Sequence, residues 1–319
     1  NKHIHSLLPL LKDMIANSIF PENELSIYLK NSKQEFMVDN ERVNFVANEK
    51  FREMIFGGSH PYGRMAKLVH FDKLKRNTLL EFYKKHYNPG YSRIIVSGKI
   101  PPEFEKIVNH TLGLMKNGTS LQSEKPIIKL KVKNEKHCGY IPKKDALQSA
   151  IVMGRLCVNK THEDYFGLTV LNTVLGGYFG SRLMANIREN KGYTYGIYSS
   201  MISMLNGGYF CIDTEVGADV SKKAIYEIYF ELRRLREELI PHNELSLVKN
   251  YMLGSFLRSI DGPFALAEKF KTIMTYGLDY SYYQNLLRTI KTITPIQLNE
   301  LANKYLQEND IHELVVGKK

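Results

Sequence analysis

An internal repeat is the feature that most constrains how this chain of 319 residues can fold. Three segments recur in the same order, in these pairs: PENEL (21–25) and PHNEL (241–245), EKF (49–51) and EKF (268–270), and the segments that end at Lys99 and Lys318. The offsets are 220, 219 and 219 residues (241 − 21, 268 − 49 and 318 − 99). Three ordered matches at a near-constant offset predict two copies of one domain.

The repeat also predicts domain boundaries. The second copy begins near Gln148, so we expect the C-terminal part of a first domain over 1–119, a polar connector over 120–146 and a second domain over 147–319. Subtracting 220 from 148 gives −72, so the first copy is expected to lack roughly seventy residues at its N-terminus if the copies are equally long. The alternative is that the first copy is naturally shorter than the second.

Hydrophobic periodicity predicts both strands and long amphipathic helices. The clearest segments are strands at 92–99, 148–158, 194–203 and 208–216 and a helix at 219–235. The turn Leu205-Asn206-Gly207 would join the third and fourth strands into a hairpin. Strands and helices come in blocks, which favours an α+β fold. We expect two homologous domains, each with a mostly antiparallel sheet packed against helices.

The formal net charge of +11 raises the question of a nucleic-acid partner. The densest basic segment, 125–136, alternates lysine with apolar residues and places Lys129, Lys131 and Lys133 on one face of a strand. A strand with a solvated lysine face explains this pattern, because lysine also blocks pairing at a sheet edge. No apolar run is long enough to span a membrane. We therefore expect neither a nucleic-acid partner nor a membrane span.

Complete catalytic motifs are missing from the sequence. It has no G-x-x-x-x-G-K-[ST] or G-x-G-x-x-G phosphate loop and no G-x-S-x-G nucleophile elbow. Neither H-E-x-x-H nor H-x-x-E-H occurs, so the chain shows no complete zinc site of its own. Arg188 and Tyr195 flank the turn glycine Gly192, but taken alone they fit a helix-end cation and a half-buried strand aromatic.

Three segments carry a family resemblance: LNTVLGGYFGSRLMANIRENKGYTYGIYSS (171–200), FGGSHPYGR (56–64) and FYKKHYNPGYSRIIVSG (82–98). They resemble the insulinase–pitrilysin family of zinc metallopeptidases, which includes the mitochondrial processing peptidases. The resemblance covers essentially the whole chain. It implies two similar domains per unit and two facing units that enclose a chamber for unfolded or short peptides. In active members the first domain binds zinc through H-x-x-E-H and a distant glutamate.

The resemblance also implies roles for individual residues. Arg188 and Tyr195 match the family's arginine–tyrosine pair, which contacts the scissile peptide and stabilises the developing oxyanion. Glu35 aligns with the distant zinc-ligand glutamate, but Tyr28 stands where active members usually carry another glutamate. A solvated helix carboxylate is the alternative interpretation of Glu35.

Zinc is accordingly expected in the intact protein or in a partner site, and none in this chain alone. The expected role is half of a peptide chamber that lends Arg188 and Tyr195 to hydrolysis by a related subunit, in a homo- or heterodimer. Two alternatives stay open. The chain could belong to an intact zinc endopeptidase whose H-x-x-E-H lies in a further N-terminal segment, or to a non-catalytic peptide-binding or assembly scaffold. The compartment is open between bacterial cytoplasm and periplasm.

Overall fold

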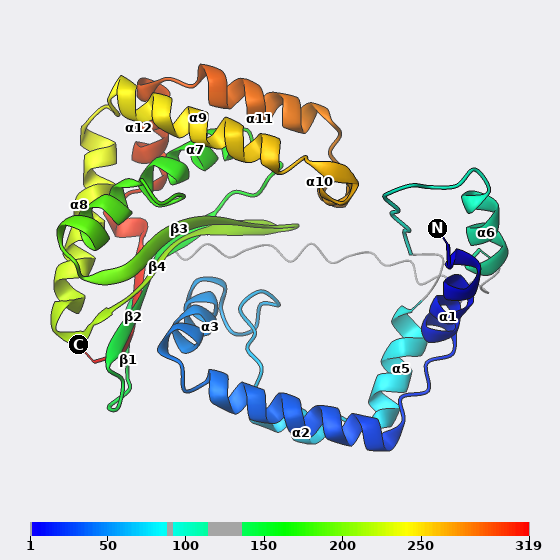
Figure 1. The fold of residues 1–319 in the computed structure, drawn as a ribbon. Helices are drawn as coiled ribbons and strands as arrows, with labels where there is room; N and C mark the ends of the chain where they lie inside the picture. The colour runs from blue at the N-terminus through cyan, green and yellow to red at the C-terminus, as the bar shows by residue number, and fades with distance from the viewer. Residues whose placement is uncertain (1, 88–91, 114–135, 319) are drawn as a thin grey trace. The chain divides into compact units, whose positions relative to one another are not determined.

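The computed structural model describes residues 2–87, 92–113 and 136–318, and its ribbon is drawn in Figure 1. Internal contacts divide the chain into two compact units. The N-terminal unit comprises 1–38, 66–126 and 260–271, and the sheet unit comprises 39–65, 127–259 and 272–319.

The helices and strands follow one another in blocks. The described α-helices are α1 (Ile4–Ala16), α2 (Glu22–Asp39), α3 (Val43–Phe56), α4 (Leu68–Lys73), α5 (Arg76–His86), α6 (Phe104–Thr111), α7 (Tyr165–Leu175), α8 (Ser221–Glu237), α9 (His242–Arg258), α10 (Gly262–Tyr276), α11 (Ser281–Thr292) and α12 (Pro295–Tyr305). The described strands are β1 (Cys138–Pro142), β2 (Gln148–Cys157), β3 (Thr194–Met204), β4 (Gly207–Gly217) and β5 (His312–Gly317). Short 3-10 turns cover Ala218–Val220 and Glu308–Asp310, and a π-helical turn covers Met184–Asn190.

The sheet unit is built on one five-stranded sheet in the order β1-β5-β2-β4-β3. β1 runs parallel to β5, and the other neighbouring strands are antiparallel. This confirms the expected α+β class with a mostly antiparallel sheet packed against helices. The hairpin of β3 and β4 forms where the alternating segments and the Asn206-Gly207 turn predict it.

Both faces of the sheet are covered, which explains why β2 is buried along most of its length. On one face, Ile151 and Met153 of β2 join a large apolar core with α7, α8, α9, α11 and α12. On the other face, Ala150 and Val152 pack with Phe51 of α3. The hydrophobic run of β2 therefore serves two layers, and α3 is the only described helix in the second core cluster.

Long-range polar contacts join helices and loops in the N-terminal unit. The Tyr83 hydroxyl donates to the Ile15 carbonyl, and the Arg76 guanidinium donates to the carbonyls of Ile19 and Phe20 at 2.8 Å. None of the described residues of this unit is buried, so its helices lack an apolar core of the kind found under the sheet. No helix in the described ranges is both long and apolar enough to cross a membrane.

The order of the helices repeats at the offset found in the sequence. α2 begins at Glu22 and α9 begins at His242, a difference of 220 residues. α5 and α12 begin at Arg76 and Pro295 and end at His86 and Tyr305, so both limits differ by 219 residues. Helices of similar length at this constant offset support the duplication, whereas the boundaries at 119 and 147 stay a prediction.

The strand predicted at 92–99 is wrong, because no strand is assigned at the described residues 92–99. Its counterpart in the repeat, β5, is a strand because it bonds to β1 and β2 on either side; an apolar segment without a neighbouring strand has no ladder to join. β1 lies inside the segment 120–146 that we expected to be a connector. The lysine-faced strand predicted at 125–136 falls, apart from Lys136, outside the described residues.

Candidate functional site

The π-helical turn Met184–Asn190 carries Arg188, and the following turn delivers the chain to β3. Gly192 has φ = 66°, a left-handed conformation that glycine adopts without steric cost. The wide π-turn replaces the ordinary helix end that the sequence predicts, and such turns occur often at functional sites. Arg188 and Tyr195 therefore lie on two segments that meet at a glycine turn.

The Arg188 side chain is held by three neighbours. Its Nε donates to the main-chain carbonyl of Tyr195 at 3.0 Å. The guanidinium lies over the Phe179 ring, 4.6 Å from the centroid, and Nη1 is 3.8 Å from a Glu189 carboxylate oxygen. A guanidinium that stacks on a ring and bonds a carbonyl is restrained in orientation. The structure thus brings Arg188 and Tyr195 together through the backbone of Tyr195, not through its phenol.

A β-bulge sets the direction of Tyr195. The pairing of β3 with β4 shifts between Thr194 and Ile197, which adds one residue to β3. Thr194 Oγ1 accepts from Gly196 N at 3.1 Å, and Thr214 Oγ1 donates to Gly196 O at 2.9 Å. Bulges re-aim side chains in this way. Tyr195 is 91% exposed, and its hydroxyl makes no hydrogen bond within the described part of the chain.

A pocket of about 310 Å³ opens beside Tyr195, on the face of the sheet that α3 covers. It is lined by Asn44, Asn48, Gln148, Ala150, Ile151, Val152, Thr194, Tyr195, Gly196, Tyr198, Asp213, Thr214 and Glu215. Arg188 does not line it. Tyr195 therefore shares this pocket with two carboxylates of β4, Asp213 and Glu215, which the sequence did not single out.

The two carboxylates lie on the same face of β4 as buried Cys211, because residues two apart on a strand point the same way. Glu215 accepts a hydrogen bond from Asn44 Nδ2 at 2.8 Å. The side chain of Asp213 makes no hydrogen bond or ion pair among residues 2–87, 92–113 and 136–318. Burial, with a further contribution from Glu215, raises the pKa of Asp213 above its ordinary value.

We predict that Asp213→Asn makes the protein more stable at pH 7. Because the folded-state pKa of Asp213 is raised, its ionised form costs free energy of folding at every pH above the unfolded-state value. The gain from the substitution should shrink as the pH falls toward about 4, the ordinary pKa of an aspartate. Urea unfolding of both proteins over this range measures it, with Asp219→Asn outside the pocket as the control; a less stable Asp213→Asn protein at pH 7 would contradict the prediction.

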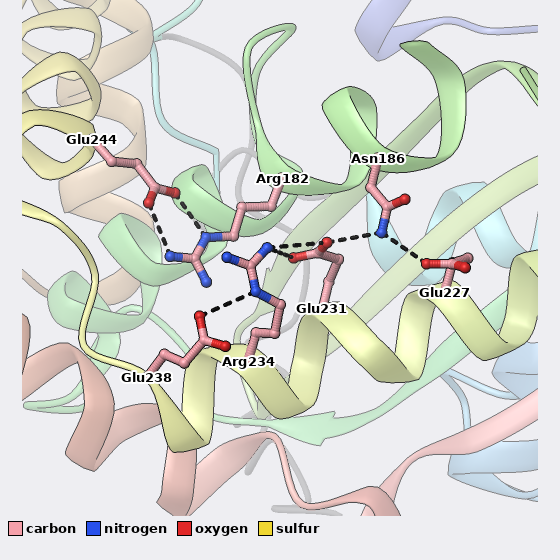
Figure 2. Close-up of polar contacts among 7 residues, drawn as sticks. All are labelled: Arg182, Asn186, Glu227, Glu231, Arg234, Glu238 and Glu244. Carbon is pink, nitrogen blue, oxygen red and sulfur yellow. Dashed lines mark hydrogen bonds and ion pairs between the residues drawn. The ribbon is translucent and has the colours of Figure 1, made fainter. Parts of the chain in front are cut away.

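A buried polar network anchors the π-turn (Figure 2). Asn186 on the turn donates to Glu231 at 2.8 Å and to Glu227 at 3.0 Å, both on α8. Arg182, just before the turn, makes a two-pronged ion pair with Glu244 of α9 at 2.8 and 2.9 Å. Arg182 is only 8% exposed. Such planar, two-pronged pairs restrain orientation and also stabilise the contact. The contacts to α8 and α9 together therefore determine where the turn lies.

Burial raises the pKa of Glu231, although the Asn186 hydrogen bond and nearby arginines act in the opposite direction. Arg234 donates to Glu231 at 3.3 Å and to Glu238 at 3.1 Å (Figure 2). The network thus has the buried acid Glu231 at its centre and reaches the surface at Glu238, and none of its seven residues lines the pocket. The spacing of Arg182, Asn186 and the α8 carboxylates in the sequence gives no signal of it.

The glycine pair 176–177 protects the outer edge of the sheet. β3 is an edge strand, and Gly176 O accepts from Ser199 N at 3.1 Å. A Cβ at Gly176 would lie 2.6 Å from Ser199 N. The end of α7 therefore approaches the strand closely and uses backbone groups that an added strand would need. The pair is a packing device, which its position after a helical segment alone does not reveal.

Glu35, the predicted zinc ligand, is an exposed residue of α2 in the N-terminal unit. Across the described ranges no group of three or more histidine, cysteine, aspartate or glutamate residues could hold a metal ion. The described residues therefore do not fit a zinc site. The role of Glu35 stays a prediction.

Fold and site define an α+β protein whose sheet bears a polar pocket and whose described residues hold no metal cluster. The model of the family described as the peptidase M16 inactive domain matches residues 73–252, more than half of the chain, so the chain belongs to this family. The resemblance stated from the sequence is confirmed. Relatives of the chain carry zinc-protease names.

The relatives differ in what their names state. The uncharacterized zinc protease YmxG of Bacillus subtilis is 27% identical over 264 residues, which is 82% of this chain and 63% of that protein. The non-peptidase homolog YmxG of Helicobacter pylori is 22% identical over 321 residues, which is 97% of this chain and 71% of that protein. The chain spans less than two thirds of the length of the Bacillus relative.

A crystal structure of a peptidase M16 inactive domain from Pseudomonas fluorescens matches with a TM-score of 0.82. The match covers 98% of this chain and 74% of that chain, at 21% identity. At this identity the comparison establishes the fold.

Proposed function

We propose that this chain forms half of a peptide-enclosing chamber and lends Arg188 and Tyr195 to hydrolysis of a peptide bond at a zinc site carried by the rest of the protein or by a related subunit. The observation that carries the proposal is the exposed phenol of Tyr195 on a fixed bulge, beside a pocket and tied to Arg188 through its own carbonyl. The bulge fixes the backbone of Tyr195, and its hydroxyl has no partner in the described residues, so it is free to donate to a bound substrate.

The chemistry assigned to the pair is hydrogen-bond donation. As a nucleophile adds to the scissile carbonyl, its oxygen gains negative charge. The Tyr195 hydroxyl can donate to that oxygen, and the guanidinium of Arg188 supplies a permanent positive charge nearby. Because Arg188 Nε is committed to the Tyr195 carbonyl, its Nη groups are the ones available to substrate. Neither residue has to change its protonation state.

We predict that Arg188→Ala and Tyr195→Phe each lower kcat of the assembled peptidase by roughly a hundredfold, with a smaller change in KM, since the hydrogen bonds strengthen in the transition state. The assay uses this chain purified with its zinc-bearing partner and an internally quenched peptide. Tyr226→Phe, at an exposed tyrosine of α8, is the matched control. Unchanged turnover in both site variants, with folding verified by circular dichroism, would contradict the proposal. So would an assembly that binds peptide without hydrolysing it.

A further inference from the structure

The pocket beside Tyr195 has a charge opposite to that of the chain as a whole. The chain carries a formal net charge of +11, yet the described residues that line the pocket include Asp213 and Glu215 and no lysine, arginine or histidine. A concave site with two carboxylates concentrates cations, because low-dielectric walls focus the field. The negative charge of the pocket therefore favours a positively charged ligand.

The carboxylates are incompletely satisfied. Glu215 accepts from Asn44, a neutral amide, and Asp213 has no partner in the part of the chain that the structure describes. Two acids on one strand face, in a partly enclosed space, repel each other and are poorly hydrated. A cation placed between them would relieve both costs, which no described side chain does.

The walls suit an organic cation. The rings of Tyr195 and Tyr198, which are 91% and 47% exposed, can cover a methylene chain, whereas Ala150 and Val152 are only 1% exposed. The same aromatic rings attract guanidinium and ammonium groups. A volume of about 310 Å³ lies at the small end of ligand pockets, which fits one side chain better than a large molecule. With only two acids present, no group of metal-ligating residues is found in the described ranges.

We propose that this pocket binds the cationic side chain of an arginine or lysine within a peptide, with the apolar stem against the rings of Tyr195 and Tyr198 and the charged head at Asp213 and Glu215. As a statement about substrate class, this rests on the proposed function, because the pocket lies beside Tyr195. The occupant would be a residue of the peptide next to the bond that Tyr195 approaches. Peptides with a basic residue at that position are then preferred.

The test is a binding titration of the protein itself. Methyl groups of Ala150 and Val152, on the α3 face of β2, border the pocket and can be observed by carbon-13 methyl NMR. The probes are N-acetyl-arginine methylamide and N-acetyl-lysine methylamide, whose blocked ends leave the side chain as the only charge. The uncharged citrulline and norleucine analogues are the matched controls. We expect saturable shifts with the cationic probes and at least about tenfold weaker binding of the neutral ones.

Variants separate the pocket from general charge attraction. Asp213→Asn with Glu215→Gln should weaken binding of both cationic probes about tenfold or more, whereas Asp219→Asn, which removes the same kind of charge outside the pocket, should leave it unchanged. Equal binding of charged and neutral probes overturns the proposal, as does the absence of shifts with every probe. If millimolar calcium, added in place of the probes, produces saturable shifts, the pocket is a metal site and the proposal is overturned. Binding only of peptides with a free α-amino group would indicate a pocket for a peptide N-terminus, which also overturns it.

Failure of the two proposals can be told apart. Pocket binding is measured without turnover, and Asp213 and Glu215 are not assigned to the hydrolytic step. If the probes bind but Arg188→Ala and Tyr195→Phe leave kcat unchanged, the pocket stands and the proposed function fails. If the probes do not bind while those substitutions lower kcat, the function stands and the basic specificity fails.

Discussion

Replacement of Gly154 by alanine should lower the free energy of unfolding by about 3 kcal/mol or more. Gly154 lies in β2 between β4 and β5. A Cβ at this position would lie 2.0 Å from the Phe210 carbonyl oxygen and 2.8 Å from Cys211 Cα. Both atoms are backbone, so relief requires the central strands to separate, and this breaks ladder hydrogen bonds on which both core layers depend.

Gly254→Ala in α9 is the matched control for this prediction. There the nearest atom to an added Cβ is the end of the flexible Arg258 side chain, at 3.8 Å. Alanine also favours a helix over glycine by about 1 kcal/mol. Urea unfolding followed by circular dichroism should therefore give opposite signs for the two substitutions. A Gly154→Ala protein as stable as the wild type would show that the sheet tolerates the extra atom, contrary to the packing seen here.

Replacement of Arg182 by alanine should cost about 3 kcal/mol, the lower end for breaking a buried ion pair. The guanidinium is almost fully buried, and its loss leaves the Glu244 carboxylate without its two-pronged donor. Glu244 is 28% exposed and can regain some water, which keeps the effect from the upper end of the range. Arg182 also precedes the π-turn, so the substitution should loosen the segment that carries Arg188.

Arg42→Ala provides the comparison, because Arg42 pairs with Asp39 at the surface of the same unit. Exposed pairs contribute about 0–1 kcal/mol, so this variant should unfold close to the wild type. Thermal or urea unfolding of both variants decides the matter. If Arg182→Ala costs no more than Arg42→Ala, the Arg182–Glu244 pair is not the anchor that its burial indicates.

The elements predicted correctly from the sequence are those whose signal lies in neighbouring residues. Alternating residues and an Asn-Gly turn place the β3–β4 hairpin correctly within one or two residues, because strand period and turn chemistry are properties of neighbouring residues. The repeat also holds, since paired helices recur at the same 219–220 offset. The strand expected at 92–99 fails for the opposite reason: an extended apolar segment becomes a strand only beside another one.

Part of the candidate site could likewise be predicted from the sequence, and part could not. The sequence pointed to Arg188 and Tyr195 through a family resemblance, and the glycine turn between them is visible in the letters. It could not show that Arg188 bonds the carbonyl of Tyr195, since that depends on the π-turn and the bulge. Nothing in the sequence singled out Asp213 and Glu215, because they become part of a pocket only when α3 packs on that face of the sheet.

The sequence by itself determined the α+β class, the duplication, the family and the arginine–tyrosine spacing, because each is written in short segments or in their periodic recurrence. Only the tertiary structure decided the pocket. Its walls come from α3, β2, β3 and β4, and the Asn44–Glu215 hydrogen bond joins residues 171 positions apart. Burial and electrostatic environment depend on which distant surfaces meet, so the chemistry of Asp213 and Glu215 emerges only when α3 packs on the sheet.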